Sequence, residues 1–152
     1  MPINFMSFIK KLKQEHEQLE RELLELETII ESERINYPNL IHVYKRLHDF
    51  WNAHEIKEED IFKILKHEKI VIPVKKMIFE HKQLKPLKEA LINAINSGNE
   101  ERIKDTLEGS ARVIIGKIRS HINFEDEVLY RITLDNFTEE EIKEAERILK
   151  LN

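Results

Sequence analysis

The chain has 152 residues, a net charge of −4 and no cysteine, and 36% of its residues are charged. These values exclude disulfides and thiolate-bound metals, and they provide no basic footprint for nucleic acid. No apolar stretch approaches the roughly 20 residues of a membrane span, and no secretory leader is recognisable. We therefore expect one soluble, cytoplasmic domain over residues 1–152 that contacts neither nucleic acid nor membrane.

Four long segments carry apolar residues at alternating steps of three and four, the period of an amphipathic helix. They span about 7–34, 40–65, 74–95 and 103–132. A shorter amphipathic segment follows at about 138–150, and Thr138 with Glu141 forms a capping box at its start.

The third and fourth segments contain local irregularities. The apolar stretch 70–72 has no partner strand in the sequence and is predicted to be a packed loop. Pro73 suits the first turn of the third helix, whereas Pro86 should kink or loosen one turn inside it. In the fourth segment, the period places Val128 and Ile132 on the inward face.

Short connections between long helices favour antiparallel neighbours. The sequence therefore predicts an all-α fold, an up-down-up-down four-helix bundle over about 8–133 with a short extra C-terminal helix. The chain contains only three glycines and four prolines, so few residues interrupt the helices.

A repeated motif places metal-binding side chains on these helices. The phrase Glu-His-x-Gln-Leu occurs at 15–19 and again at 80–84, and a His-x-x-x-Glu pair follows each copy at nearly the same distance. The six candidate ligands are His16, His54, Glu58, His81, His121 and Glu125. In the predicted bundle all six occupy core positions about 12–15 Å from the same end.

Six polar groups in one core layer need compensation, because a buried unpaired carboxylate costs several kcal/mol. Lys85 is the one cation with an obvious pairing position on these faces. Two metal ions would compensate the layer, and imidazole with carboxylate suits iron, manganese or zinc. In the symmetric arrangement each ion takes two histidines, and Glu58 and Glu125 bridge the two ions.

The other notable side chains have simpler interpretations. Three further histidines are expected at the surface or in packing positions, namely His42, His48 and His67. Trp51 is expected to pack in the core rather than to relay electrons, and Tyr44 and Tyr130 to cover the bundle ends. The acidic neighbours of the two glutamates are expected to be solvated: Glu59, Asp60, Asp126 and Glu127.

A lone His followed by His-x-x-x-Glu, twice over on four helices, resembles the hemerythrin-like or HHE cation-binding domain. The resemblance covers about residues 8–133 and implies a non-haem di-iron centre, oxo- or hydroxo-bridged, held by the six residues above. Oxygen carriers of this family have a seventh ligand, a histidine, where this chain has Lys85, and an aspartate where it has Asp126. Glu125 at the repeated position is more similar to the branch with symmetric six-residue sites.

The resemblance implies a protein that binds or reacts with a small oxidant or diatomic, O2, NO or peroxide. The alternative is a non-catalytic iron or oxygen sensor or an iron-storage module, in which the C-terminal helix contacts a partner or a second copy. A purely structural bundle would leave the donor layer unexplained. Lys85 would either point outward or shield an open metal position.

Overall fold

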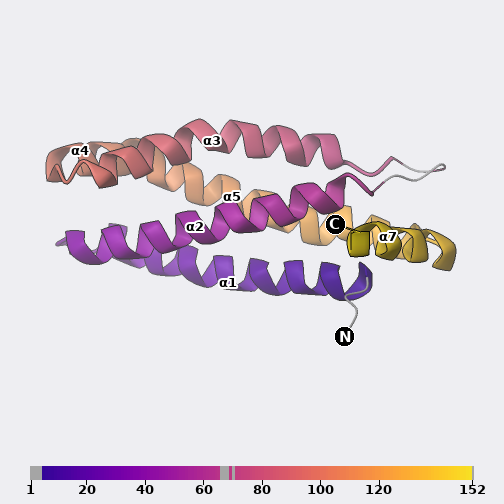
Figure 1. The fold of residues 1–152 in the computed structure, drawn as a ribbon. Coiled ribbons are helices and arrows are strands. Elements are labelled where there is room, and N and C mark those ends of the chain that lie inside the picture. Colours follow the sequence, from indigo (N-terminus) through magenta and orange to yellow (C-terminus); the bar gives the residue numbers. More distant parts are fainter. Residues whose placement is uncertain (1–4, 66–68, 70, 152) are drawn as a thin grey trace.

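The computed structural model describes residues 5–65, 69 and 71–151 and shows a bundle of long antiparallel helices (Figure 1). The first three are α1 (Phe5–Glu31), α2 (Tyr37–Phe62) and α3 (Val74–Asn96). Each begins at the end of the bundle where the preceding one finishes, so the predicted up-down-up-down order is confirmed.

The fourth long helix contains two π-helical turns. It consists of α4 (Glu100–Thr106), η1 (Leu107–Ala111), α5 (Arg112–Phe124), η2 (Glu125–Leu129) and α6 (Tyr130–Asn136). A π turn accommodates one extra residue and so shifts the register of everything after it.

The shift caused by η2 corrects one prediction. Val128 and Ile132 are only half-buried, and the residues that enter the core instead are Leu129, Tyr130 and Thr133. A regular helical period continued past Glu125 points at the wrong side chains, because the π turn inserts one residue into that period.

Local sequence explains where the helices begin. The Asn36 side chain accepts a hydrogen bond from the Asn39 backbone N–H at the start of α2, and Asn99 does the same for Arg102 at α4. α3 follows Pro73 and continues through Pro86 without interruption. In the preceding connector Ile72 is buried and Val71 exposed, whereas Ile70 and His67 lie outside the described residues.

The last helix, α7 (Glu139–Leu151), lies at the end of the bundle where α1 begins, and it contacts α1 (Figure 1). The predicted capping box is present: the Thr138 N–H donates to the Glu141 carboxylate, and the Glu141 N–H donates to the Thr138 hydroxyl. Ala145 of α7 is buried, and it belongs to the same hydrophobic cluster as Leu12 of α1. The expected C-terminal helix is therefore confirmed.

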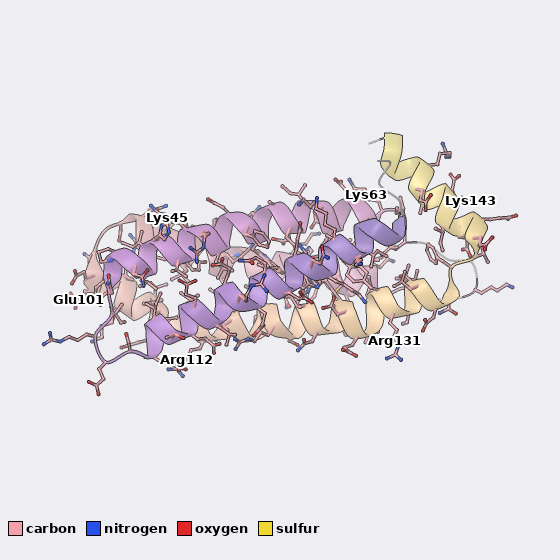
Figure 2. All side chains as sticks on the ribbon, turned by 90° about the horizontal axis from the view of Figure 1, so that it is seen from below. Lys45, Lys63, Glu101, Arg112, Arg131 and Lys143 are labelled. Carbon is pink, nitrogen blue, oxygen red and sulfur yellow. The ribbon has the colours of Figure 1, made fainter. Side chains whose placement is uncertain are left out.

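The core consists of two hydrophobic clusters, and most charged side chains lie outside it. One cluster surrounds Trp51 and Leu91, and the other surrounds Leu12 and Met77. In Figure 2 labelled charged residues such as Arg112 point away from the bundle. No helix in the described part of the chain is long and apolar enough to cross a membrane.

Candidate metal centre

The six predicted ligands lie together between the two hydrophobic clusters, and every one is at most 2% exposed. His16 comes from α1, His54 and Glu58 from α2, and His81 from α3. His121 comes from the last turn of α5, and Glu125 opens η2. Residues four apart share a helical face, so each His-x-x-x-Glu pair directs both side chains to one point.

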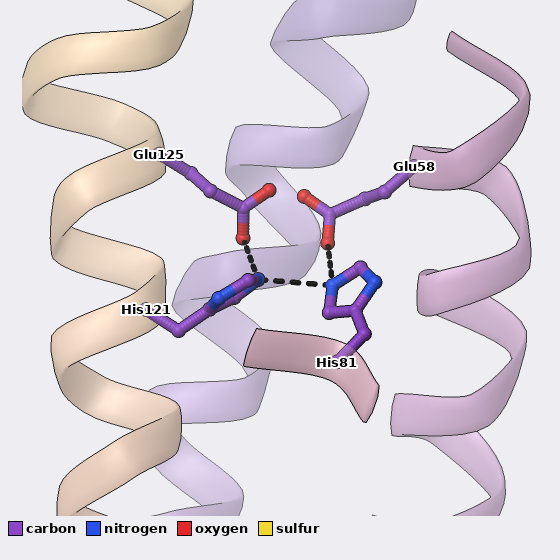
Figure 3. A group of neighbouring side chains, drawn as sticks. All are labelled: Glu58, His81, His121 and Glu125. Atoms are coloured by element: carbon purple, nitrogen blue, oxygen red, sulfur yellow. Dashed lines mark hydrogen bonds and ion pairs between the residues drawn. The ribbon is translucent and has the colours of Figure 1, made fainter. Parts of the chain in front are cut away.

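The imidazoles meet in two pairs through their Nε2 atoms. The Nε2 atoms of His16 and His54 are 2.9 Å apart, and those of His81 and His121 are also 2.9 Å apart. Figure 3 shows the second pair below the two carboxylates. This separation is compatible with two imidazoles that share an ion, because metal–nitrogen bonds are about 2.0–2.1 Å long.

The two carboxylates lie between the imidazole pairs. Glu58 oxygens are 3.2 Å from Nε2 of His54 and 3.5 Å from Nε2 of His81, so this carboxylate reaches both pairs. Glu125 Oε1 is 2.8 Å from Nε2 of His121 and 3.8 Å from Nε2 of His16. Both glutamates are therefore placed where a bridging role is geometrically possible.

Tyr130 belongs to this layer, and its expected place over the bundle end is wrong. Its hydroxyl donates to Glu58 at 2.8 Å and lies 3.3 Å from Glu125, and the residue is fully buried. Five residues along a regular α-helix turn the side chain about 140° away from the starting face. The π turn η2 reduces that rotation and lets Glu125 and Tyr130 share the core. Tyr44 is likewise buried inside the bundle, where its hydroxyl donates to the Lys88 carbonyl at 3.4 Å.

A ring of acidic side chains surrounds the histidines on their outer side. Asp126 is 2.8 Å from Nδ1 of His16, and Glu15 is 2.9 Å from Nδ1 of His54. Glu59 is 3.3 Å from Nδ1 of His81. An Nδ1–H that donates outward leaves the Nε2 lone pair directed inward, which is the tautomer that a metal ligand needs.

Asp126 and Glu59 each follow an inward glutamate, and each reaches the lone histidine of the adjacent helix. Asp126 is only 30% exposed, which corrects the expectation that it is solvated. Glu59, Asp60 and Glu127 are exposed, as expected. Glu15 and Glu80 each precede a lone histidine and point toward the histidine of the next helix. The repeat itself contained this information, because both glutamates are part of the duplicated phrase.

Two lysines other than Lys85 enter the network. Lys57 Nζ is 2.8 Å from Glu15, which in turn bonds His54. Lys88 is 5% exposed, and its Nζ is 2.7 Å from Glu55 and 3.0 Å from Asn52. Lys85 is exposed at the edge of a hollow of about 300 Å³ between α2 and α3. The buried cation of α3 is therefore Lys88.

The carboxylates and imidazoles have strongly perturbed proton affinities. Burial raises the pKa of Glu125 and the negative charge of Glu58 raises it further, well above its usual range. Burial opposes ionisation of Glu58 as well, but its close contacts with the Glu125 carboxyl and the surrounding imidazoles hold its pKa well below its usual range. One carboxyl group thus keeps a proton while its neighbour is ionised.

The pKa values of two histidines in the layer are also shifted in opposite directions. Burial lowers the pKa of His16, but hydrogen bonds with Asp126 and Glu58 outweigh burial and raise the pKa to about 9. Burial, together with the other imidazoles, lowers the pKa of His121 to about 3, although Glu58 opposes this shift. Such opposed shifts within one buried cluster are typical of functional sites.

Aromatic rings close the layer on the side of the larger cluster. The Trp51 ring centroid is 5.8 Å from those of His54 and His121 and 6.0 Å from that of His81. Trp51 is fully buried, which confirms its expected place in the core. Of the remaining histidines, His42 is exposed and His48 is half-buried near Asn52, as expected.

The donor set fits metal ions. Atoms of Glu58, His81, His121 and Glu125 lie within 4.8 Å of one another, and so do atoms of His16, His54 and Glu58. Among the described residues, Glu58 Oε1 and Glu125 Oε1 are buried without a hydrogen bond of acceptable geometry. Buried carboxylate oxygens without donors are costly, and a cation at this position would satisfy them.

A four-helix bundle that buries a layer of imidazoles and carboxylates defines a class of helical proteins built to hold cations in the core. A family model for the hemerythrin HHE cation-binding domain matches residues 7–133, and the chain therefore belongs to that family. No curated protein and no solved structure matched the chain. The further assignment to a branch with symmetric six-residue sites stays a prediction.

Proposed function

We propose that the chain is a non-haem di-iron protein that binds or reacts with a small oxidant or diatomic, namely O2, NO or peroxide. His16, His54, Glu58, His81, His121 and Glu125 would hold the two ions, with Glu58 and Glu125 shared between them. The observation that carries this proposal is the layer of six converging donors buried between two hydrophobic clusters. Manganese or zinc could occupy the same donors, since imidazole and carboxylate suit all three metals.

Two iron ions, when bound, supply reversible electron transfer to a small oxidant. The chain's own residues fix the donors and keep the layer dry. Asp126, Glu15 and Glu59 orient three imidazoles through Nδ1. Tyr130 places a hydroxyl donor at Glu58, and Trp51 excludes water from the side of the larger cluster.

Access to the layer supports a small reactant rather than a large one. A hollow of about 490 Å³ lies beside His16 and Asp126, and the hollow of about 300 Å³ lies beside Glu55 and Glu59. The donors themselves are almost fully buried, so a diatomic or peroxide fits the site better than an extended substrate.

The proposal is tested by mixing the anaerobic ferrous protein with O2, NO or hydrogen peroxide in a stopped-flow spectrophotometer. We expect a rapid absorbance change with at least one of them, absent in a Glu125→Ala variant that has lost iron. Iron-loaded protein that remains spectrally unchanged with all three would contradict the reaction while leaving metal binding intact.

The alternative is a sensor or iron-storage role, and the contact between α7 and α1 supports it. α1 carries His16, and the buried Ala145 anchors α7 at the end of the same bundle. A structural change in α1 on iron binding would then be transmitted to α7. Through α7 it would reach a second copy of the chain or another protein partner. Iron-dependent association in analytical ultracentrifugation, without any reaction with oxidants, would support this alternative.

A further inference from the structure

The internal repeat allows the two halves of the centre to be compared position by position. The first half contains His16 and His54, and the second half contains His81 and His121. Glu15 matches Glu80, because each directly precedes the lone histidine of its half. A symmetric centre requires matched residues to make matched contacts.

The first half is firmly anchored. Nδ1 of His16 is 2.8 Å from Asp126, and Nδ1 of His54 is 2.9 Å from Glu15. Lys57, 2.8 Å from the other oxygen of Glu15, holds that carboxylate in place. Both imidazoles of this half therefore have a hydrogen bond of ordinary length on the outer nitrogen.

The second half is anchored more weakly. Glu80 Oε2 is 3.6 Å from Nδ1 of His121, and neither atom has a hydrogen-bond partner among the described residues. The position that matches Lys57 holds Phe124, since each directly precedes the inward glutamate of its half. Glu80 thus lacks the close cation that fixes Glu15, and its nearest ammonium, that of Lys76, is 3.9 Å away.

His81 is also held less closely than its counterpart His16. Its Nδ1 is 3.3 Å from Glu59 and 3.6 Å from Glu55. Lys88 binds the other oxygen of Glu55 at 2.7 Å and so draws this carboxylate toward itself. The positions of the repeat that match Lys88 and Glu55 hold the buried, apolar Leu23 and Ile122.

An imidazole fixed through Nδ1 already has the orientation that a metal requires, whereas an unfixed one must be ordered on binding. We infer that the two metal positions are inequivalent: the His16/His54 half takes the first and tighter ion, and the His81/His121 half takes the second and weaker one. This inference rests on the proposed di-iron function. Glu15 is a positioning residue in it, and Glu80 is its matched counterpart without that effect.

The test is an anaerobic calorimetric titration of the full chain with ferrous iron. We expect two steps whose affinities differ by about 10–100-fold, the usual worth of an outer partner of a ligating histidine. Glu15→Gln should weaken the tighter step by a similar factor and leave the weaker step unchanged. Glu80→Gln removes the same charge from the matched position and should change neither step much.

A second measurement does not depend on any variant. One equivalent of Zn²⁺ added to 15N-histidine-labelled protein should shift the ring resonances of His16 and His54 and leave those of His81 and His121 until the second equivalent. Two ions bound with equal affinity, filling in the reverse order, or a loss in Glu80→Gln as large as in Glu15→Gln would overturn the inference but not the di-iron proposal. Failure to bind any ion would overturn both.

Discussion

At the scale of single residues, the positions of the six candidate ligands could be predicted from their spacing, but their supporting contacts could not. The i, i+4 pairs and the duplicated Glu-His phrase were enough to place the six donors in one layer. Tyr130 could not be placed, because its position depends on a π turn that no sequence period indicates. The buried position of Lys88 was not predicted, because a lysine in the core is explained only by its partners Glu55 and Asn52, which lie on another helix.

Tyr130→Phe should destabilise the metal-free protein. The substitution removes the hydroxyl that donates to Glu58 at 2.8 Å, so a buried carboxylate loses a donor at a cost of about 1–3 kcal/mol. Urea unfolding measures the change. Tyr44→Phe is the matched control, because its hydroxyl makes a single 3.4 Å contact with a carbonyl and its loss should cost less. If both variants lose the same free energy of unfolding, the hydrogen bond from Tyr130 to Glu58 contributes no more than the contact of Tyr44.

Asp126→Asn should weaken iron binding, contrary to what a solvated side chain would do. Asp126 fixes His16 through Nδ1, and the loss of such a partner costs about 10–100-fold in metal affinity. Glu127→Gln, at the exposed neighbouring position, is the control and should leave affinity unchanged. A competition titration against a chromophoric chelator measures both. Equal iron affinities for the two variants would show that Asp126 behaves as an ordinary solvated side chain.

At the scale of elements, the sequence predicted every long helix, and the boundaries differ by a few residues. Helix propensity, the three-four apolar period and the asparagine caps all favour the same elements, so they agree with the tertiary structure. The interior of the fourth helix was the exception. Register after Glu125 shifts by one residue, which exchanges Val128 and Ile132 for Leu129 and Thr133 in the core.

This shift predicts that one residue can be removed from the fourth helix. Deleting Glu127, which is exposed within η2, should convert the π turn into an α turn and leave Glu125 and Tyr130 on one face. The variant should fold with a melting temperature near that of the parent and retain iron. Deleting the exposed Lys117 of the regular α5 rotates His121 and Glu125 by about 100° and should abolish iron binding. If both deletions are equally damaging, η2 is not a removable insertion.

At the scale of the whole molecule, the proposed iron site should couple metal binding to the stability of the bundle. The folded chain gathers donors that the unfolded chain disperses, so iron should raise the melting temperature. At a free iron concentration 100 times the dissociation constant, the gain is about 2.7 kcal/mol. The metal-free protein should remain largely helical by circular dichroism, because the two hydrophobic clusters do not need metal. Identical melting curves with and without iron would contradict this coupling.

Proton competition gives the whole molecule opposite pH dependences with and without metal. Burial lowers the pKa of His16, but Asp126 and Glu58 raise it to about 9, above the ordinary 6.5. Protonated His16 therefore stabilises the folded metal-free protein. This contribution to the free energy of unfolding is complete below pH 6.5 and is lost as the pH rises toward 9. An incoming ion must displace that proton, so iron affinity should increase over the same window. Between pH 6.5 and pH 9, the melting temperature of the metal-free protein should therefore fall while its iron affinity rises. If both quantities change in the same direction, His16 is not the protonated group that iron displaces.

The central claim is that six buried donors from four helices hold two iron ions. The most direct test is metal analysis of the chain after anaerobic reconstitution with ferrous iron and removal of loosely bound metal. The account predicts two ions per chain in the parent protein, and loss of both in Glu58→Ala, because that carboxylate reaches both imidazole pairs. One ion or none in the parent protein would contradict it.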